Sequence, residues 1–173
     1  LKINFSKKEE NLQKSGSFIM QAVILAAGKS TRTYPLTLTR PKPLLKAAGK
    51  TLLEYNLDNL MGIADEAVLV VGYRKGMIKK AIGSNYKGIK IRYVEQKKQL
   101  GTAHAVSLVE HLIKNEFLLM MGDDIYSKKD MMKCTRHKYS ILTARVKNPE
   151  NFGVVTGENI MQDFVEKPKK FIS

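Results

Sequence analysis

The amino-acid sequence predicts an α/β fold in three layers, with a mixed, mainly parallel sheet between layers of helices. From Met20 onward, short apolar runs alternate with stretches of helical period, a pattern typical of a parallel sheet covered by helices. After Asp124 consecutive strand-like runs predict some antiparallel strands as well. At 173 residues, 43% of them hydrophobic, the chain has the size of one domain with a core of its own.

Each predicted element has a recognisable pattern. The parallel strands are expected at residues 22–25, 67–71, 89–94 and 117–121. The clearest helix starts at Thr102, the expected N-cap, and carries apolar residues at i, i+3, i+4, i+7 and i+8 spacing as far as Ile113. A short helix over residues 127–135 and strands over 140–146, 153–156 and 160–165 are expected to follow.

Residues 1–19 are polar and charged and lack the apolar segment of a signal peptide. We predict a disordered extension there and one domain over residues 20–173. No apolar run approaches the length of a membrane span, so we expect a soluble protein with no membrane partner. The single cysteine, Cys134, excludes an internal disulfide framework and a cysteine-cluster metal site, which suits a reducing compartment such as the cytoplasm.

The charge balance indicates an anionic partner. The chain has 30 Lys+Arg against 16 Asp+Glu, a net charge of +14, and such a balance attracts nucleic acid, anionic lipid or phosphorylated small molecules. The basic residues occur as short pairs spread along the chain, without the Arg-rich block or aromatic interleaving of a nucleic-acid reader. We therefore expect no nucleic-acid partner. A nucleic-acid binder driven by charge is the alternative, and its binding would weaken steeply with salt.

The loop after the first predicted strand has the composition of a phosphate loop. Small residues from Leu25 to Gly28 let the backbone close on a phosphate chain, and Arg32 supplies a charge to clamp it. An ordinary glycine-containing β–α turn is the alternative. Further on, Pro41 and Pro43 stiffen the chain around Lys42, and a rigidly held ammonium suits an α-phosphate, where charge builds during substitution at phosphorus. A surface lysine in a proline-bounded loop is the alternative there.

Together these segments resemble a known signature. Gly-Lys-Ser-Thr-Arg at 28–32, Pro-Leu-Thr at 35–37 and Pro-Lys-Pro-Leu at 41–44 are similar to the signature of the sugar-1-phosphate nucleotidylyltransferases, also called nucleotide-sugar pyrophosphorylases. The resemblance implies a Rossmann-like fold and covers residues 20–173. Ser30 departs from it, because the family usually has a second glycine there. A serine is tolerated at that position if its backbone dihedrals are ordinary.

Later motifs follow in the family's order. Gln96 and Leu-Gly-Thr-Ala-His-Ala at 100–105 resemble the segment that holds the base, and a glutamine amide can match the edge of uracil or thymine. Without the neighbouring motif, Gln96 would be interpreted as an ordinary loop residue. His104 and His111 are interpreted as structural. The resemblance implies nucleotide binding by these residues: Leu25, Ala26, Ala27, Gly28, Gln96, Gly101 and Thr102.

The Gly-Asp-Asp run at 122–124 follows the fourth predicted strand, where a carboxylate is a hard oxygen ligand for Mg²⁺. The resemblance implies that Asp123 binds this metal and that Asp124 tolerates substitution. A turn or helix cap is the alternative. By the same resemblance Gly153 approaches the sugar, Glu166 binds its hydroxyls and Lys167 meets its phosphate. A β-hairpin with an exposed Glu-Lys pair is the alternative.

The implied reaction joins a sugar 1-phosphate to a nucleoside triphosphate, with UTP or dTTP favoured, and releases pyrophosphate. The implied catalytic residues are Arg32, Lys42 and Asp123, acting with Mg²⁺ by positioning and charge neutralisation. The resemblance also implies a chain incomplete at its C-terminus, lacking a sugar-binding strand and a second acidic metal ligand. An unpaired edge there would favour a homo-oligomer. A module that binds a nucleotide or nucleotide sugar without turnover is therefore the main alternative. The related enzymes that transfer GMP to a molybdenum cofactor are disfavoured, because they lack the Pro-Leu-Thr and Pro-Lys-Pro-Leu segments found here at 35–37 and 41–44.

Overall fold

The computed structural model describes residues 2–3, 20–157 and 160–168 and divides the chain into two compact units, residues 1–141 and 142–173. Each unit is described by itself. No helix in the described ranges is long and apolar enough to cross a membrane.

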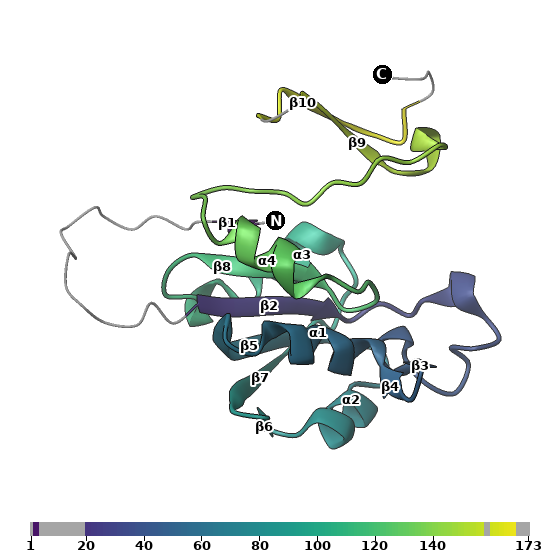
Figure 1. Ribbon diagram of the computed structural model, residues 1–173. Helices are drawn as coiled ribbons and strands as arrows, with labels where there is room; N and C mark the ends of the chain where they lie inside the picture. The colour runs from purple at the N-terminus through teal and green to yellow at the C-terminus, as the bar shows by residue number, and fades with distance from the viewer. Residues whose placement is uncertain (1, 4–19, 158–159, 169–173) are drawn as a thin grey trace, which may run out of the picture. The chain divides into compact units, whose positions relative to one another are not determined.

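The first unit contains the predicted mixed, mainly parallel sheet. Its six strands have the order β1-β8-β2-β5-β7-β6, with β2 near the centre (Figure 1). The strands are β1 (Lys2–Ile3), β2 (Met20–Ala26), β5 (Ala64–Val71), β6 (Asn85–Tyr86), β7 (Ile89–Glu95) and β8 (Phe117–Met121). β2 runs parallel to β5 and to β8, and β5 runs parallel to β7. The two edge strands, β1 and β6, pair antiparallel with β8 and β7.

Helices cover both faces of this sheet. Alternate residues of β2 and β5 belong to two separate apolar clusters, because successive side chains of a strand point to opposite faces. Val23 and Val68 pack in a cluster with α3, whereas Ile24 and Leu69 pack in a cluster with α1, α2 and α4. The helices are α1 (Leu52–Leu60), α2 (Lys75–Ile82), α3 (Thr102–Ser107) and α4 (Lys128–Cys134). The predicted three-layer arrangement is therefore confirmed.

Short elements complete the first unit. They are the 3-10 turns η1 (Thr31–Thr33), η2 (Lys42–Leu44) and η3 (Glu110–Leu112). A small antiparallel sheet is formed by β3 (Lys46–Ala47) and β4 (Lys50–Thr51). The β3–β4 hairpin leads directly into α1, which begins with a capping box. The Oγ1 of Thr51 accepts from the Glu54 amide at 3.1 Å, and the Glu54 carboxylate accepts from the Thr51 amide at 2.7 Å.

An ionic cluster on Asp58 ties this hairpin and the β6–β7 hairpin to α1. Lys50 and Lys87 donate to the Asp58 carboxylate at 2.6 and 2.7 Å, and the Tyr86 hydroxyl donates at 3.1 Å. These hydrogen bonds, from Lys50 first and then Lys87, lower the pKa of Asp58 to about 2. The carboxylate is therefore charged throughout the ordinary pH range, and three segments are joined at one end of the helix.

The second unit contains a 3-10 turn, η4 (Pro149–Asn151), and two antiparallel strands, β9 (Gly153–Thr156) and β10 (Asp163–Glu166). β9 has the predicted bounds. The expected strand over residues 140–146 is wrong, since Ser140 forms an isolated bridge and residues 141–146 take no regular structure. All six side chains there are exposed, so the apolar residues of that run have no core to pack against.

The helix expected from Thr102 to Ile113 is shorter than its apolar pattern. α3 ends at Ser107, and bonds of 3-10 type carry the chain onward, from Val109 to Val106 at 3.1 Å and from Leu112 to Val109 at 2.9 Å. The N-cap is Gly101, not Thr102. The apolar residues beyond Ser107 still face the core, as the fully buried Val109 shows. The apolar spacing does not distinguish the α-helix from the tighter 3-10 turn.

Candidate functional site

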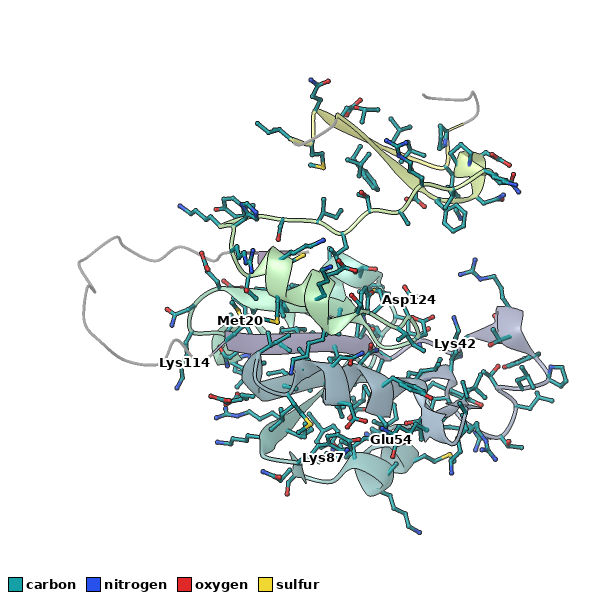
Figure 2. The ribbon with its side chains drawn as sticks, in the orientation of Figure 1. Met20, Lys42, Glu54, Lys87, Lys114 and Asp124 are labelled. Carbon is teal, nitrogen blue, oxygen red and sulfur yellow. The ribbon has the colours of Figure 1, made fainter. Side chains whose placement is uncertain are left out.

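The carboxyl ends of β2, β7 and β8 surround a cavity of about 340 Å³, large enough for a small organic ligand. Its walls are Leu25, Ala26, Ala27, Gly28, Ser30, Pro43, Gln96, Gln99, Gly101, Thr102, Ala105, Met121 and Asp123. All seven predicted nucleotide-binding residues therefore lie around one space, together with Asp123. Figure 2 shows Lys42 and Asp124 at this end of the sheet and Met20 and Lys114 at the opposite end.

The first loop is held from both sides by the strands next to β2. Leu25 accepts a hydrogen bond from the Gly122 amide at 2.8 Å. The Ala27 carbonyl accepts from the Tyr73 amide at 3.2 Å and from the side-chain amide of Gln99 at 2.8 Å. The floor of the cavity is therefore a fixed backbone surface, as a phosphate-binding loop requires.

Ser30 adopts a left-handed conformation, with φ 52° and ψ 44°. The condition stated for tolerating a serine here, ordinary backbone dihedrals, is therefore not met. Its carbonyl accepts three hydrogen bonds, from the Thr33 amide at 3.1 Å and from the hydroxyls of Thr33 and Thr37 at 2.7 and 2.9 Å. These bonds hold a conformation that glycine would adopt without steric cost, which explains why glycine suits this position.

Sequence reasoning missed two glycines that allow the strand ends to approach one another. A Cβ on Gly72 would lie 2.8 Å from the Ala27 carbonyl oxygen, and a Cβ on Gly122 would lie 2.9 Å from the Leu25 carbonyl oxygen. Both glycines directly follow strands that flank β2. Their position was the available signal, because neighbouring parallel strands bring their ends together.

We expect Gly122→Ala to lower the free energy of unfolding by about 1–3 kcal/mol, because the added methyl would meet backbone that cannot rotate away. Urea unfolding measures this change. Gly76→Ala is the matched control: a Cβ at Gly76, in α2, meets no atom within 4 Å, and alanine should stabilise the helix by about 0.5–1 kcal/mol. Equal stability of the Gly122 variant and the wild type would contradict the close approach.

Lys42 forms an ion pair with Asp123, a residue of the cavity wall. Lys42 begins η2, between the buried Pro41 and Pro43, and its Nζ lies 2.9 Å from Oδ2 of Asp123. Both side chains keep part of their surface open, 27% for Lys42 and 33% for Asp123. This ion pair was not predicted. It holds a partly exposed cation next to a carboxylate of the cavity wall.

Two asparagines of α1 hold the turn that carries Asp123. The Asn56 side chain is fully buried and donates to the Asp124 carbonyl at 2.7 Å, and Asn59 donates to the Tyr126 carbonyl at 2.9 Å. The Tyr126 hydroxyl accepts from the Met121 amide at 3.1 Å, and burial raises the pKa of this hydroxyl. The turn is thus held by hydrogen bonds of neutral groups, and within the described residues the exposed Asp124 side chain makes no hydrogen bond.

Arg32 lies in η1 and is exposed. It does not line the cavity, and within the described ranges it makes no hydrogen bond or ion pair. The role of Arg32 as a phosphate clamp stays a prediction. Thr102, in contrast, lines the cavity from the first turn of α3.

The predicted sugar-facing residues lie in the second unit and come together there. Glu166 pairs with Gly153 across β9 and β10, and a Cβ on Gly153 would lie 3.0 Å from Oε2 of Glu166. The Lys167 amide donates to the Phe152 carbonyl at 2.9 Å, and the Lys167 side chain is exposed. The hairpin thus places the glycine and the carboxylate side by side.

The cavity wall offers one carboxylate that could hold a hard cation together with a ligand. Asp123 is its acidic residue, and Oδ1 of Asp123 has no hydrogen-bond partner among the described side chains. No cluster of three or more His, Cys, Asp or Glu occurs in the described part of the chain. A single carboxylate fits Mg²⁺, which is commonly held by one or two carboxylates together with substrate phosphates.

The sequence and the fold are similar to those of known proteins. Residues 21–173 match the Nucleotidyl transferase family. The bifunctional protein GlmU of Methanococcus vannielii is 39% identical over 153 residues, which are 87% of this chain and 36% of that protein. The UTP–glucose-1-phosphate uridylyltransferase AglF of Haloferax volcanii is 44% identical over 109 residues, 62% of this chain and 45% of AglF.

The fold is similar to that of a UDP-glucose pyrophosphorylase solved with UDP-glucose, with a TM-score of 0.74 at 26% identity, over 87% of this chain and 69% of that one. The chain spans just over a third of the length of the GlmU relative. Because the family match covers nearly the whole sequence and the cavity carries the family's motifs, the chain belongs to the nucleotidyl transferase family.

Proposed function

We propose that this chain carries the nucleotide site of an enzyme that transfers a nucleotidyl group from UTP or dTTP to a sugar 1-phosphate. The products are a nucleotide sugar and pyrophosphate. The observation that carries the proposal is the cavity in which the first loop, Gln96, Gly101, Thr102 and Asp123 converge, with Lys42 paired to Asp123. The identity to AglF, a uridylyltransferase, supports the choice of a pyrimidine nucleotide.

In the proposed reaction an oxygen of the sugar phosphate forms a bond to the α-phosphorus. The bond from that phosphorus to the oxygen bridging to the β-phosphate breaks, and pyrophosphate leaves. The fixed loop backbone from Leu25 to Gly28 holds the triphosphate in line for this attack. Lys42, held by its two prolines, provides a positive charge where negative charge develops on phosphorus.

Asp123 would hold Mg²⁺ jointly with the triphosphate. When bound, the metal neutralises phosphate charge. Asp123 already positions the Lys42 ammonium in the free protein, so metal and lysine use the same carboxylate. Gly153, Glu166 and Lys167 are proposed to bind the sugar phosphate, and their proximity in one hairpin supports a shared role.

The test is a pyrophosphate-release assay that crosses UTP, dTTP, CTP, GTP and ATP with glucose, N-acetylglucosamine and mannose 1-phosphates, each with and without Mg²⁺. We expect release that requires both Mg²⁺ and a sugar phosphate and is fastest with UTP or dTTP. Nucleotide binding without release would identify a binding module. Strongest binding and turnover with a purine triphosphate would contradict the assignment of the base.

A further inference from the structure

Gln96 is the buried polar side chain of the candidate base site. It follows β7 directly, and only 6% of its surface is exposed. The backbone N–H of Gln96 donates to the Val71 carbonyl at 2.9 Å. Its Nε2 lies 3.1 Å from the Gly101 carbonyl oxygen and 3.1 Å from Nδ1 of His104. The side chain therefore bridges the end of β7 and the start of α3.

These two contacts use both hydrogens of the Gln96 amide. Since Nε2 of Gln96 can only donate, Nδ1 of His104 is the acceptor in this contact. Oε1 of Gln96 accepts no hydrogen bond from the described residues. Every fully buried side-chain oxygen or nitrogen among these residues has a partner, so Oε1 is not fully buried. Oε1 therefore remains open as an acceptor for a ligand in the cavity that Gln96 lines.

We propose that His104 is a positioning residue for base selection. Together with the Gly101 carbonyl, it holds the Gln96 amide so that the cavity presents Oε1 and not Nε2. A ligand then meets an acceptor, which pairs with the ring N3–H of uracil or thymine. Cytosine has an acceptor at N3 and would leave two acceptors facing each other. This inference rests on the proposed function, and it makes His104 more than the structural residue expected from the sequence.

Both acceptors that hold the amide belong to the rigid start of α3. The Gly101 carbonyl also accepts the first helical bond, from Ala105 at 3.2 Å. The His104 carbonyl accepts from the Ser107 hydroxyl at 2.9 Å and from the Leu108 amide at 3.3 Å. Reversing the Gln96 amide would place its oxygen against the Gly101 carbonyl oxygen and would also require the ring proton of His104 to lie on Nδ1.

The experiment compares the affinities for UTP and CTP within each variant by isothermal titration calorimetry, with Mg²⁺ and without sugar phosphate. The wild type is expected to favour UTP by about tenfold or more, as for a mismatch between buried polar groups. His104→Leu removes one of the two acceptors, so the UTP-to-CTP ratio should fall by about threefold or more. His104→Asn, whose side-chain oxygen can replace Nδ1, should restore much of the ratio.

Ser107→Ala is the matched control on the same helix. It removes the hydrogen bond to the His104 carbonyl without changing the imidazole, and its UTP-to-CTP ratio should equal that of the wild type. If His104→Leu does not fold, His104→Ala makes the same comparison.

A purely structural His104 would lower both affinities together and leave the ratio unchanged, which would overturn the inference. Equal affinity of the wild type for UTP and CTP would overturn it as well. If the wild type binds no nucleotide, the proposed function itself fails, and the inference fails with it.

Discussion

Replacing Asp123 with asparagine should lower the rate of Mg²⁺-dependent pyrophosphate release by at least about 10²-fold. The substitution keeps the shape of the side chain but removes the charge that would hold the metal and that now pairs with Lys42. Folding should be nearly unaffected, because a partly exposed ion pair contributes at most about 1 kcal/mol. The turn itself is held by main-chain contacts to Asn56 and Asn59, which the substitution leaves in place.

Asp124→Asn is the matched control for this prediction, since it neutralises the adjacent carboxylate. The Asp124 side chain is exposed, and among the described residues only the Asp124 carbonyl makes a hydrogen bond, so the rate should stay within about threefold of wild type. Initial rates over a series of Mg²⁺ concentrations, with urea unfolding of each variant, provide the comparison. Equal rates for the two variants would remove Asp123 from the proposed metal site.

Lys42→Ala should also reduce the rate by at least about 10²-fold, because a preorganised cation at the reacting phosphate is lost. Its effect should be mainly on kcat, since the charge is needed most where it develops in the transition state. Lys46→Ala is the control: this exposed lysine lies four residues further on in β3 and outside the cavity. Steady-state kinetics with UTP and the best sugar phosphate would measure the difference.

The double variant Lys42→Ala with Asp123→Asn sharpens this test. Residues that act as a unit show strongly non-additive losses, so the double variant should be little worse than either single variant. Losses that multiply would indicate that the two residues act separately. A Lys42→Ala variant with wild-type kcat would rule out the proposed role of the lysine.

The positions of the strands could be predicted from sequence because buried parallel strands are continuous apolar runs. Residues 117–121 match β8, and the other three predicted strands lie inside β2, β5 and β7. The cavity could be predicted as well, because Leu25, Gln96 and Asp123 lie on segments at the carboxyl ends of these strands. What carried the prediction was the order of the motifs, since a single Gly28 or Gln96 fits an ordinary loop.

The remaining features depend on contacts between distant residues. The Lys42–Asp123 pair joins segments that the sequence does not orient, and the close approach of Gly72 and Gly122 to the first loop depends on how the strand ends are spaced. Residues 141–146 have the composition of a strand but no core to pack against. The role of His104 depends on which nitrogen faces Gln96, and no sequence pattern specifies that atom.

The strand order also determines when the fold can be completed as the protein is made. Gln21 of β2 pairs with Glu66 of β5 on one side and with Phe117 of β8 on the other. While the chain emerges from the ribosome, β2 and β5 can associate first, and one edge of β2 waits for residues 117–121. An apolar strand edge left open during synthesis is vulnerable to aggregation, and long-range parallel pairing is slow. The central strand is therefore the segment where chaperone protection during translation would matter most.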